Sequence, residues 1–291
     1  MPEITAALVK ELRERTNEAM MDCKRALVAT NGDIEAAIKA MRNEGKAKAV
    51  KKASRTAAEG TIVALNAKDG KKALLIEVNC ETDFVAREGK FREFATQSAN
   101  HAITKNIKSI EDLQKETEDA RLELVGQLGE NISVRRLALH EVSEGVVGTY
   151  AHGDANGVRI AALVVLAKGD ESLARDLAMQ VAAMNPQYLT PQDVPKERLA
   201  EEKAIFEKQT REEGKPEAMI EKIVDGKLKK FANEISLTGQ PFVKDPSKTV
   251  EALLKESKAE VKSFVRFEVG EGIEKKEDNF VQEVMAQVRG E

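Results

Sequence analysis

The stretch Ala73-Leu74-Leu75-Ile76-Glu77-Val78 has the apolar, β-rich composition of a buried strand, and its neighbours complete the smallest unit of the fold. A second β-rich stretch, residues 61–65, precedes it across the turn signal Asp69-Gly70, which predicts a hairpin. A helical pattern follows over residues 90–103. This order predicts a unit in which one helix covers one face of a small sheet.

The same order recurs further along the chain, which predicts an internal duplication. Glu59-Gly60 opens the first copy and Glu144-Gly145 opens the second. The second copy consists of strands at 146–150 and 159–166, the turn Gly153-Asp154-Ala155-Asn156-Gly157 between them, and a helix at 173–184. Each copy is expected to bury one sheet face under its own helix.

The first 45 residues contain three short amphipathic helical patterns. Their apolar faces are Ile4, Leu8 and Leu12, then Met20, Cys23 and Leu27, then Ile34, Ile38 and Met41. Thr16 is placed to cap the second helix, Asn31-Gly32 to end it, and Asp33 to cap the third. The pattern resembles a ubiquitin-associated three-helix module, usually a docking unit. The basic stretch at 46–55 is expected to be a solvated linker or helix face, not an RNA site.

Helical patterns also occur outside these units. Ser109 and Gly129 are typical of a helix start and a helix end, so a connecting helix is expected between the two copies. Residues 191–235 predict two charged helices with a break at Gly214-Lys215-Pro216, hence an antiparallel hairpin. Its thin apolar stripe leaves pairing with a second chain open. The tail is expected to contain a loop at 237–243, a strand at 263–269 and a final helix with Phe280, Val281, Val284, Met285 and Val288.

Together these elements predict an α+β protein with five parts, whose duplicated core has antiparallel sheets with helices. The parts are a three-helix N-terminal module with its linker (1–55), a first core subdomain (56–142), a second core subdomain (143–190 and 236–272), a protruding helical hairpin or coiled-coil insertion (191–235) and a C-terminal helical module (273–291). The final helix could pack on its own core or on another protein.

The composition argues for a protein partner. Lys and Arg number 46 against 50 Asp and Glu, a formal charge of −4, so no global basic field attracts nucleic acid. The longest apolar stretch, 160–167, is too short to span a membrane, and Met1-Pro2-Glu3-Ile4-Thr5 lacks the features of a secretory signal. A cytoplasmic protein is therefore expected, with Cys23 and Cys80 as buried thiols.

The motifs of common catalytic and nucleotide-binding sites are missing from the sequence. No Gly-x-x-x-x-Gly-Lys-Ser/Thr string appears, so direct GTP binding is not expected, and Gly270-Glu271-Gly272 is interpreted as a turn. His101, His140 and His152 lack metal-ligand spacing. We expect no enzyme activity, no metal and no cofactor.

The most informative run follows the first strand pair and reads Asn79-Cys80-Glu81-Thr82-Asp83-Phe84-Val85-Ala86-Arg87. It places Asp83 and Phe84 where the chain leaves the sheet for a helix, the natural position of a loop tip. The corresponding exit in the second copy, Lys168-Gly169-Asp170-Glu171, has no aromatic residue. The scaffold therefore does not require Phe84, and we expect it to be an exposed probe and not a core residue.

This run, extended back to Glu77, resembles the central signature of the bacterial elongation factor Ts family. Leu12-Arg13-Glu14-Arg15-Thr16 and the run from Met20 to Leu27 are similar to its N-terminal motif, although the family usually has glycines where Asn17 and Ala19 stand. The segments 236–243 and 266–272 are also similar, so the resemblance spans nearly the whole chain.

The resemblance implies a guanine nucleotide exchange factor whose partner is the GTPase elongation factor Tu. The factor would bind the GDP form and promote GDP release so that GTP can rebind. By this resemblance Thr82, Asp83, Phe84 and Val85 reach toward the partner's magnesium site, where Phe84 wedges between apolar side chains and Asp83 disturbs the metal-linked network. Met20, Met21 and Lys24 would grip the GTPase domain, and His152 and Val243 match other contact positions.

The residues alone leave two other classes open. One is a hydrolase with an unrecognised site, and the other is a peptide- or RNA-binding module without exchange activity, built on the N-terminal helices and the basic stretch. A dimer of factor–GTPase heterodimers is also left open.

Overall fold

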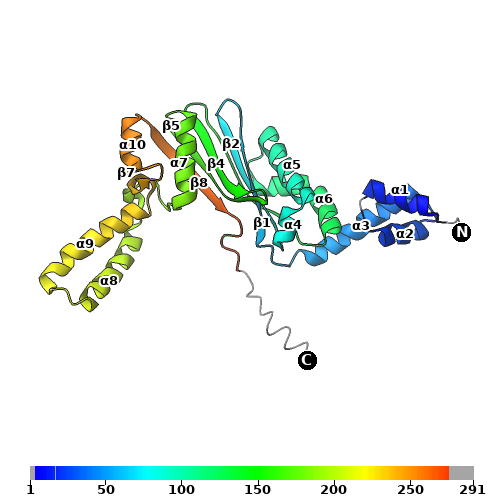
Figure 1. The fold of residues 1–291 in the computed structure, drawn as a ribbon, viewed down its shortest axis with the longest axis horizontal. Helices are drawn as coiled ribbons and strands as arrows, with labels where there is room; N and C mark the ends of the chain where they lie inside the picture. The colour runs from blue at the N-terminus through cyan, green and yellow to red at the C-terminus, as the bar shows by residue number, and fades with distance from the viewer. Residues whose placement is uncertain (1–3, 17, 275–291) are drawn as a thin grey trace, which may run out of the picture.

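A computed structural model describes residues 4–16 and 18–274 of the chain. It confirms the α+β class, with helices around small antiparallel sheets. The molecule is elongated, with the N-terminal helices at one end, two sheets in the middle and a helical hairpin at the other end (Figure 1). The predicted final helix lies outside the described residues.

The first sheet has strand order β1-β2-β3, and all neighbours are antiparallel. It comprises β1 (Glu59–Asn66), β2 (Lys72–Cys80) and β3 (Ser133–Glu141), and it packs against α5 (Gly89–Lys105) and α6 (Ile110–Leu128). The hairpin and both helices confirm the prediction. β3 was not predicted, because Arg135 and Arg136 interrupt the alternation that marks a strand.

The second sheet has strand order β4-β5-β8. It comprises β4 (Val146–Asp154), β5 (Gly157–Lys168) and β8 (Glu260–Glu268), with α7 (Glu171–Met184) packed on one face. The predicted strand at 263–269 is β8. It reaches β5 only after the whole hairpin insertion, so the third strand of each sheet comes from a distant part of the chain.

The faces of the two sheets that α5 and α7 do not cover pack against each other. A buried cluster joins Ile62 and Leu75 of the first sheet to Leu163, Val165 and Phe267 of the second. The stretch 73–78 is therefore buried on both faces, since Leu74 and Ile76 face the first helical layer and Leu75 faces the second sheet. Sequence analysis predicted the helix-covered faces but not this sheet-on-sheet contact.

The N-terminal helices are α1 (Ala6–Thr16), α2 (Met20–Ala29) and α3 (Ile34–Lys52). Asn31 and Gly32 have φ values of 52° and 86°, so they form a left-handed turn after α2, which confirms the predicted end of that helix. Asp33 Oδ1 accepts from the N–H of Ala36 at 3.0 Å, which confirms the cap of α3. The Thr16 cap is wrong, because α2 begins only at Met20 after Ala19, whereas Thr16 is the last residue of α1 and its hydroxyl donates to the carbonyl of Leu12 at 2.8 Å.

Helix α3 is longer than predicted and includes most of the expected linker. It lies against α6 at a close crossing, where a Cβ on Gly126 would come 3.3 Å from Cα of Gly45. The two glycines thus allow the helix backbones to approach. Lys52, the last residue of α3, donates from Nζ to the carbonyl of Gly129 at 2.6 Å. The connection between module and core is therefore helical and packed.

The predicted hairpin is formed by α8 (Lys196–Glu212) and α9 (Glu217–Glu234), which lie side by side (Figure 1). The Phe206 and Phe231 rings meet edge-on with centroids 6.2 Å apart. Ile205 and Met219 are exposed on the hairpin, and its pairing with a second chain stays a prediction. The short elements near its base are η1 (Pro191–Asp193), η2 (Leu237–Gly239), β6 (Pro241–Phe242), β7 (Asp245–Thr249) and α10 (Val250–Glu256).

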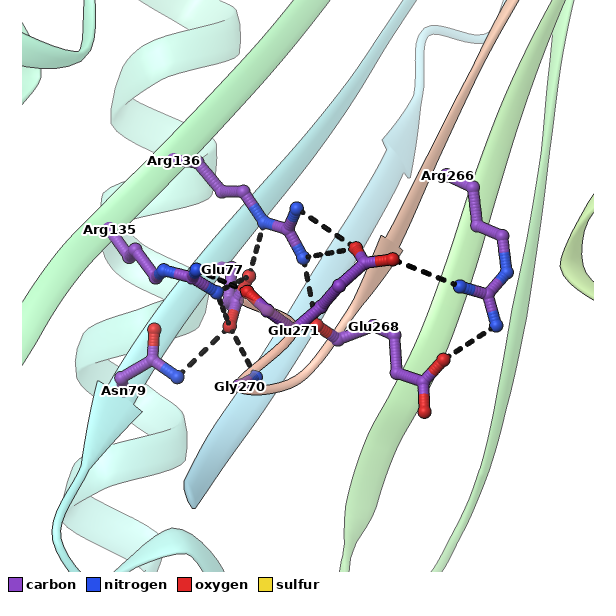
Figure 2. A network of polar contacts seen from close by, with 8 residues as sticks. All are labelled: Glu77, Asn79, Arg135, Arg136, Arg266, Glu268, Gly270 and Glu271. Atoms are coloured by element: carbon purple, nitrogen blue, oxygen red, sulfur yellow. Dashed lines mark hydrogen bonds and ion pairs between the residues drawn. The ribbon is translucent and has the colours of Figure 1, made fainter. Parts of the chain in front are cut away.

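A buried carboxylate joins the two sheets beyond their apolar contact. Glu77 on β2 is 0% exposed, and its Oε1 accepts from the N–H of Gly270 at 2.9 Å and from Asn79 Nδ2 at 2.9 Å. Arg135 Nη1 lies 3.1 Å from the same oxygen, and Arg136 Nε donates to Oε2 (Figure 2). A single carboxylate thus connects β2, β3 and the turn after β8.

The two arginines reach one carboxylate because β3 contains a bulge. Glu77 pairs with Arg136 across the sheet and Val78 pairs with Val134, so Arg135 is the extra residue. Without this bulge, adjacent side chains on a strand would point to opposite faces. Glu271 extends the network, since its carboxylate contacts both Arg136 and Arg266 (Figure 2).

We expect acid to remove the stability that the Glu77 carboxylate contributes where the two sheets meet. Burial raises the pKa of Glu77, but the hydrogen bonds from Gly270, Asn79 and Arg136 outweigh that effect and hold the pKa below its ordinary 4.5. A depressed carboxylate pKa stabilises the fold above the unfolded value, and this contribution is lost as pH falls from about 4.5 toward the folded pKa. We therefore expect the stability difference between the parent and Glu77→Gln, measured by urea unfolding, to shrink below pH 4.5. A constant difference down to the acid transition would contradict this assignment.

Candidate functional site

Phe84 lies on a short helix that the sequence did not predict. Residues expected to form a loop tip form α4 (Asp83–Arg87), a five-residue helix between β2 and α5. Thr82 caps it, because its Oγ1 accepts from the N–H of Val85 at 3.3 Å. The Phe84 side chain is 75% exposed, so the prediction that it is not a core residue is confirmed.

One face of α4 is anchored and the other is free. Val85 and Ala86 are buried in the core of the first sheet, so the Val85 side chain does not present a free surface in this state. Asp83 Oδ2 accepts from Arg87 Nη2 at 2.6 Å, one helical turn away. The exposed part of the run is therefore Phe84 flanked by the half-exposed Asp83–Arg87 pair.

The start of α4 is held by a residue that sequence reasoning missed. Glu130 follows α6, and its Oε2 accepts from the N–H groups of Glu81 at 3.1 Å and Thr82 at 3.0 Å. Its Oε1 accepts from the Thr82 hydroxyl at 2.6 Å. One glutamate among 50 acidic residues carries no local signal, so only the tertiary structure identifies this contact.

The Cys80 thiol is part of the same support. Burial, and secondarily the charge of Glu130, raises the pKa of Cys80 to about 12. The thiol therefore stays protonated and donates to the carbonyl of Thr82 at 3.2 Å. Both Cys80 and Cys23 are buried free thiols, as predicted.

The second copy of the unit has no counterpart of α4. After β5, Asp170 caps α7 directly, with its Oδ1 accepting from the N–H of Leu173 at 2.8 Å. The chain thus passes from β5 to α7 through Gly169 and Asp170 alone. Helix α4 is thus specific to the first unit, whose exit also carries the aromatic residue that the second exit lacks.

His152 lies on the strand hairpin that approaches this region. Arg92 of α5 donates from Nη1 to the carbonyl of Ala155 at the β4–β5 turn, at 2.9 Å. Hydrogen bonds from Asn156 hold the pKa of Asp154 below its usual range, and the guanidinium of Arg87 adds to this effect. The tip of the hairpin therefore lies near α4 and α5. His152 itself is exposed, with its Nδ1 3.4 Å from the Tyr150 hydroxyl.

The predicted residues on α2 form a separate exposed face. Met20 is 54% and Met21 66% exposed, and Lys24 is also exposed. Cys23 and Leu27 of the same helix are buried and fix its orientation. Val28 is exposed on this helix and was not predicted, although its spacing of seven residues from Met21 places it on the same face.

Val243 is half-buried beyond β6 and is held by its backbone. Its N–H donates to Gln180 Oε1 at 2.8 Å, and Gln180 Nε2 donates to Gln240 Oε1 at 3.1 Å. Gln240 Nε2 then donates to the carbonyl of Glu234 at the end of α9, at 2.8 Å. These two buried glutamines tie Val243 to α7 and to the hairpin.

The candidate residues therefore occupy three surfaces. Helix α4 and the tip of the β4–β5 hairpin are adjacent, whereas α2 and the β6–β7 region lie in different parts of the elongated molecule (Figure 1). A single small ligand could not touch all three, but a large protein could. Within 4–16 and 18–274, no three His, Cys, Asp or Glu side chains converge to hold a metal ion. In the same residues, no helix is both long and apolar enough to cross a bilayer.

Comparison with known proteins gives one consistent result. A family model described as Elongation factor TS matches residues 81–271. Elongation factor Ts of Legionella pneumophila (strain Paris) is 53% identical over 297 residues, which cover 99% of this chain and 100% of the relative. The protein of the same name from Alkalilimnicola ehrlichii is 51% identical over 293 residues, with 99% of both chains covered. That from Yersinia pestis (strain Pestoides F) is 51% identical over 286 residues, or 98% of each chain.

Proposed function

The chain belongs to the elongation factor Ts family, and from this membership we propose that it is a guanine nucleotide exchange factor for elongation factor Tu. It binds the GDP form of that GTPase and accelerates GDP release. No covalent step is involved, so the chain acts as a binding protein and not as an enzyme. Acting on a translation factor places it in the cytoplasm.

The observation that carries this proposal is the exposed Phe84 on an anchored helix. An aromatic side chain that is 75% exposed has little role in the free fold, while Val85 and Ala86 keep its helix in place. Aromatic residues, Phe among them, are enriched in protein–protein interfaces relative to the rest of the surface. From the resemblance to the family, we infer that Phe84 wedges between apolar side chains of the partner and that Asp83 disturbs the network around the partner's magnesium ion.

The other surfaces provide docking energy. Met20, Met21 and Lys24 grip the GTPase domain through α2, and Val28 extends that apolar face. His152 and Val243 contact further parts of the partner. Because these surfaces are spread along the molecule, the partner is held at several points while the wedge acts at one of them.

Thermodynamic linkage explains how the cycle can proceed. If the factor binds the nucleotide-free partner more tightly than the GDP form, GDP must weaken binding of the factor by the same ratio. Rebinding of GTP then displaces the factor for the same reason. The exchange cycle therefore depends on preferential binding of the factor to the nucleotide-free partner.

The direct test is the release of a fluorescent GDP derivative from elongation factor Tu, chased with excess GDP, with and without this chain. We expect the release rate to rise with factor concentration and then saturate. A flat response would refute the exchange function. Salt-sensitive RNA binding together with such a flat response would favour the RNA-binding alternative.

A further inference from the structure

We propose that Glu130 is a positioning residue for the exchange reaction, because its carboxylate fixes the start of the helix that presents Phe84. This inference rests on the proposed exchange function and extends it to a residue outside the exposed run. Glu130 is half-buried directly after α6. Its two oxygens accept from two backbone N–H groups and one hydroxyl, belonging to Glu81 and Thr82.

The chemistry of this contact requires an acceptor without donors. All three groups facing Glu130 donate hydrogen bonds, and an ionised carboxylate can accept every one of them. The Thr82 hydroxyl has only one proton, which it gives to Oε1 of Glu130. Its lone pairs are then free to accept from the N–H of Val85, which is the cap of α4. Glu130 thus orients the hydroxyl that starts the helix.

The contact is reciprocal between two loops. While Glu130 accepts from residues 81 and 82, Glu81 Oε1 accepts from the N–H of Asn131 at 2.6 Å. Asn131 Nδ2 in turn donates to the carbonyl of Arg55 at 2.8 Å, and Lys52 donates to Gly129. The loop at 129–131 therefore joins the end of the N-terminal module to the start of α4.

Helix α4 depends on such support because it is short. Five residues form little more than one turn, and an isolated helix of that length is unstable in water. Val85 and Ala86 hold one face of it, but they do not fix where its first turn begins. The direction of Phe84, the second residue of the helix, is set by the cap and hence by Glu130.

The test uses Glu130→Gln, which keeps the shape but replaces one acceptor oxygen with a donor amide. We expect the saturated rate of GDP release from elongation factor Tu to fall about 10-fold, from the loss of charge-assisted hydrogen bonds. The factor concentration giving half-maximal rate should change little, since α2 and the other docking surfaces are intact. Glu116→Gln is the matched control and should match the parent, because Glu116 lies on α6 itself and pairs with the half-buried His101.

A double-mutant cycle separates positioning from general destabilisation. In a Phe84→Ala background, Glu130→Gln should cause almost no further loss, because the side chain that it positions is already absent. Glu130→Asp keeps the charge but shortens the reach, and we expect an intermediate rate. Full additivity with Phe84→Ala, or parent-like rates for Glu130→Gln, would overturn the proposal.

A measurement without the partner distinguishes this inference from the proposed function. Amide hydrogen exchange at Thr82 and Val85 should accelerate by at least about 10-fold in Glu130→Gln, while amides of β5 and α7 stay protected. If the parent fails to release GDP, the exchange function is refuted, and this experiment still tests the Glu130 contact. Unchanged protection at Thr82 and Val85 would refute the positioning role even if the parent is active.

Discussion

Phe84→Ala is expected to slow factor-stimulated GDP release from elongation factor Tu by roughly 10- to 150-fold, from about 1.5–3 kcal/mol for burying an aromatic side chain. The substitution should lower the maximal rate of GDP release and not the affinity for the partner, because the wedge contact forms only as the nucleotide site opens. Stability should be unchanged, since Phe84 is exposed and lies outside the buried clusters. Stopped-flow fluorescence with saturating factor measures the rate, and urea unfolding measures the stability.

Two variants control this experiment. Phe84→Leu keeps an apolar wedge and should retain part of the activity. Met219→Ala removes another exposed apolar side chain, on the distant hairpin, and should leave the maximal rate unchanged. If Phe84→Ala matches the parent in rate while binding is intact, the wedge mechanism is wrong.

Glu77→Ala is expected to produce the largest loss of stability, about 3 kcal/mol in the free energy of unfolding. Removing the carboxylate leaves Arg135, Arg136 and the N–H of Gly270 without their shared acceptor at a buried junction. The arginines keep about a quarter of their side-chain surface in water, 25% and 26%, so the value lies at the lower end of the range for broken buried pairs. Urea unfolding followed by circular dichroism measures the loss.

Glu271→Ala is the matched comparison, because Glu271 contacts the same Arg136 but is 44% exposed. Its loss should cost less than about 1 kcal/mol, as for other surface ion pairs. Equal effects of the two substitutions would show that Glu77 is not the centre of this network.

Local signals predicted much of the fold. The hairpins β1–β2 and β4–β5 and the helices after them followed from apolar strands, turn residues and helical periodicity. The break at 214–216 predicted the turn between α8 and α9. In each case the interacting residues are close in sequence, so local composition and spacing are enough to predict the element. The Thr16 cap failed because α1 extends to Thr16 and α2 begins four residues later, at Met20.

The candidate site was predicted in part. The exposure of Phe84 was predicted by comparing the two copies, because the second copy shows that the scaffold does not require an aromatic residue at this position. That its run forms a capped helix did not follow, since five residues show no periodicity. The exposed Val28 could have been found from its spacing to Met21.

The repeating strand–strand–helix units, the helical hairpin and the unusual position of Phe84 could thus be predicted from the sequence. How these parts combine could not: β3 and β8 join their sheets from far along the chain, and the two sheets stack through Ile62 and Leu163. Only the tertiary structure revealed the acceptors Glu77 and Glu130, whose partners lie up to 193 residues away. The physical reason is that periodicity reports which side of an element is apolar, whereas a buried carboxylate is defined by donors that only folding brings together.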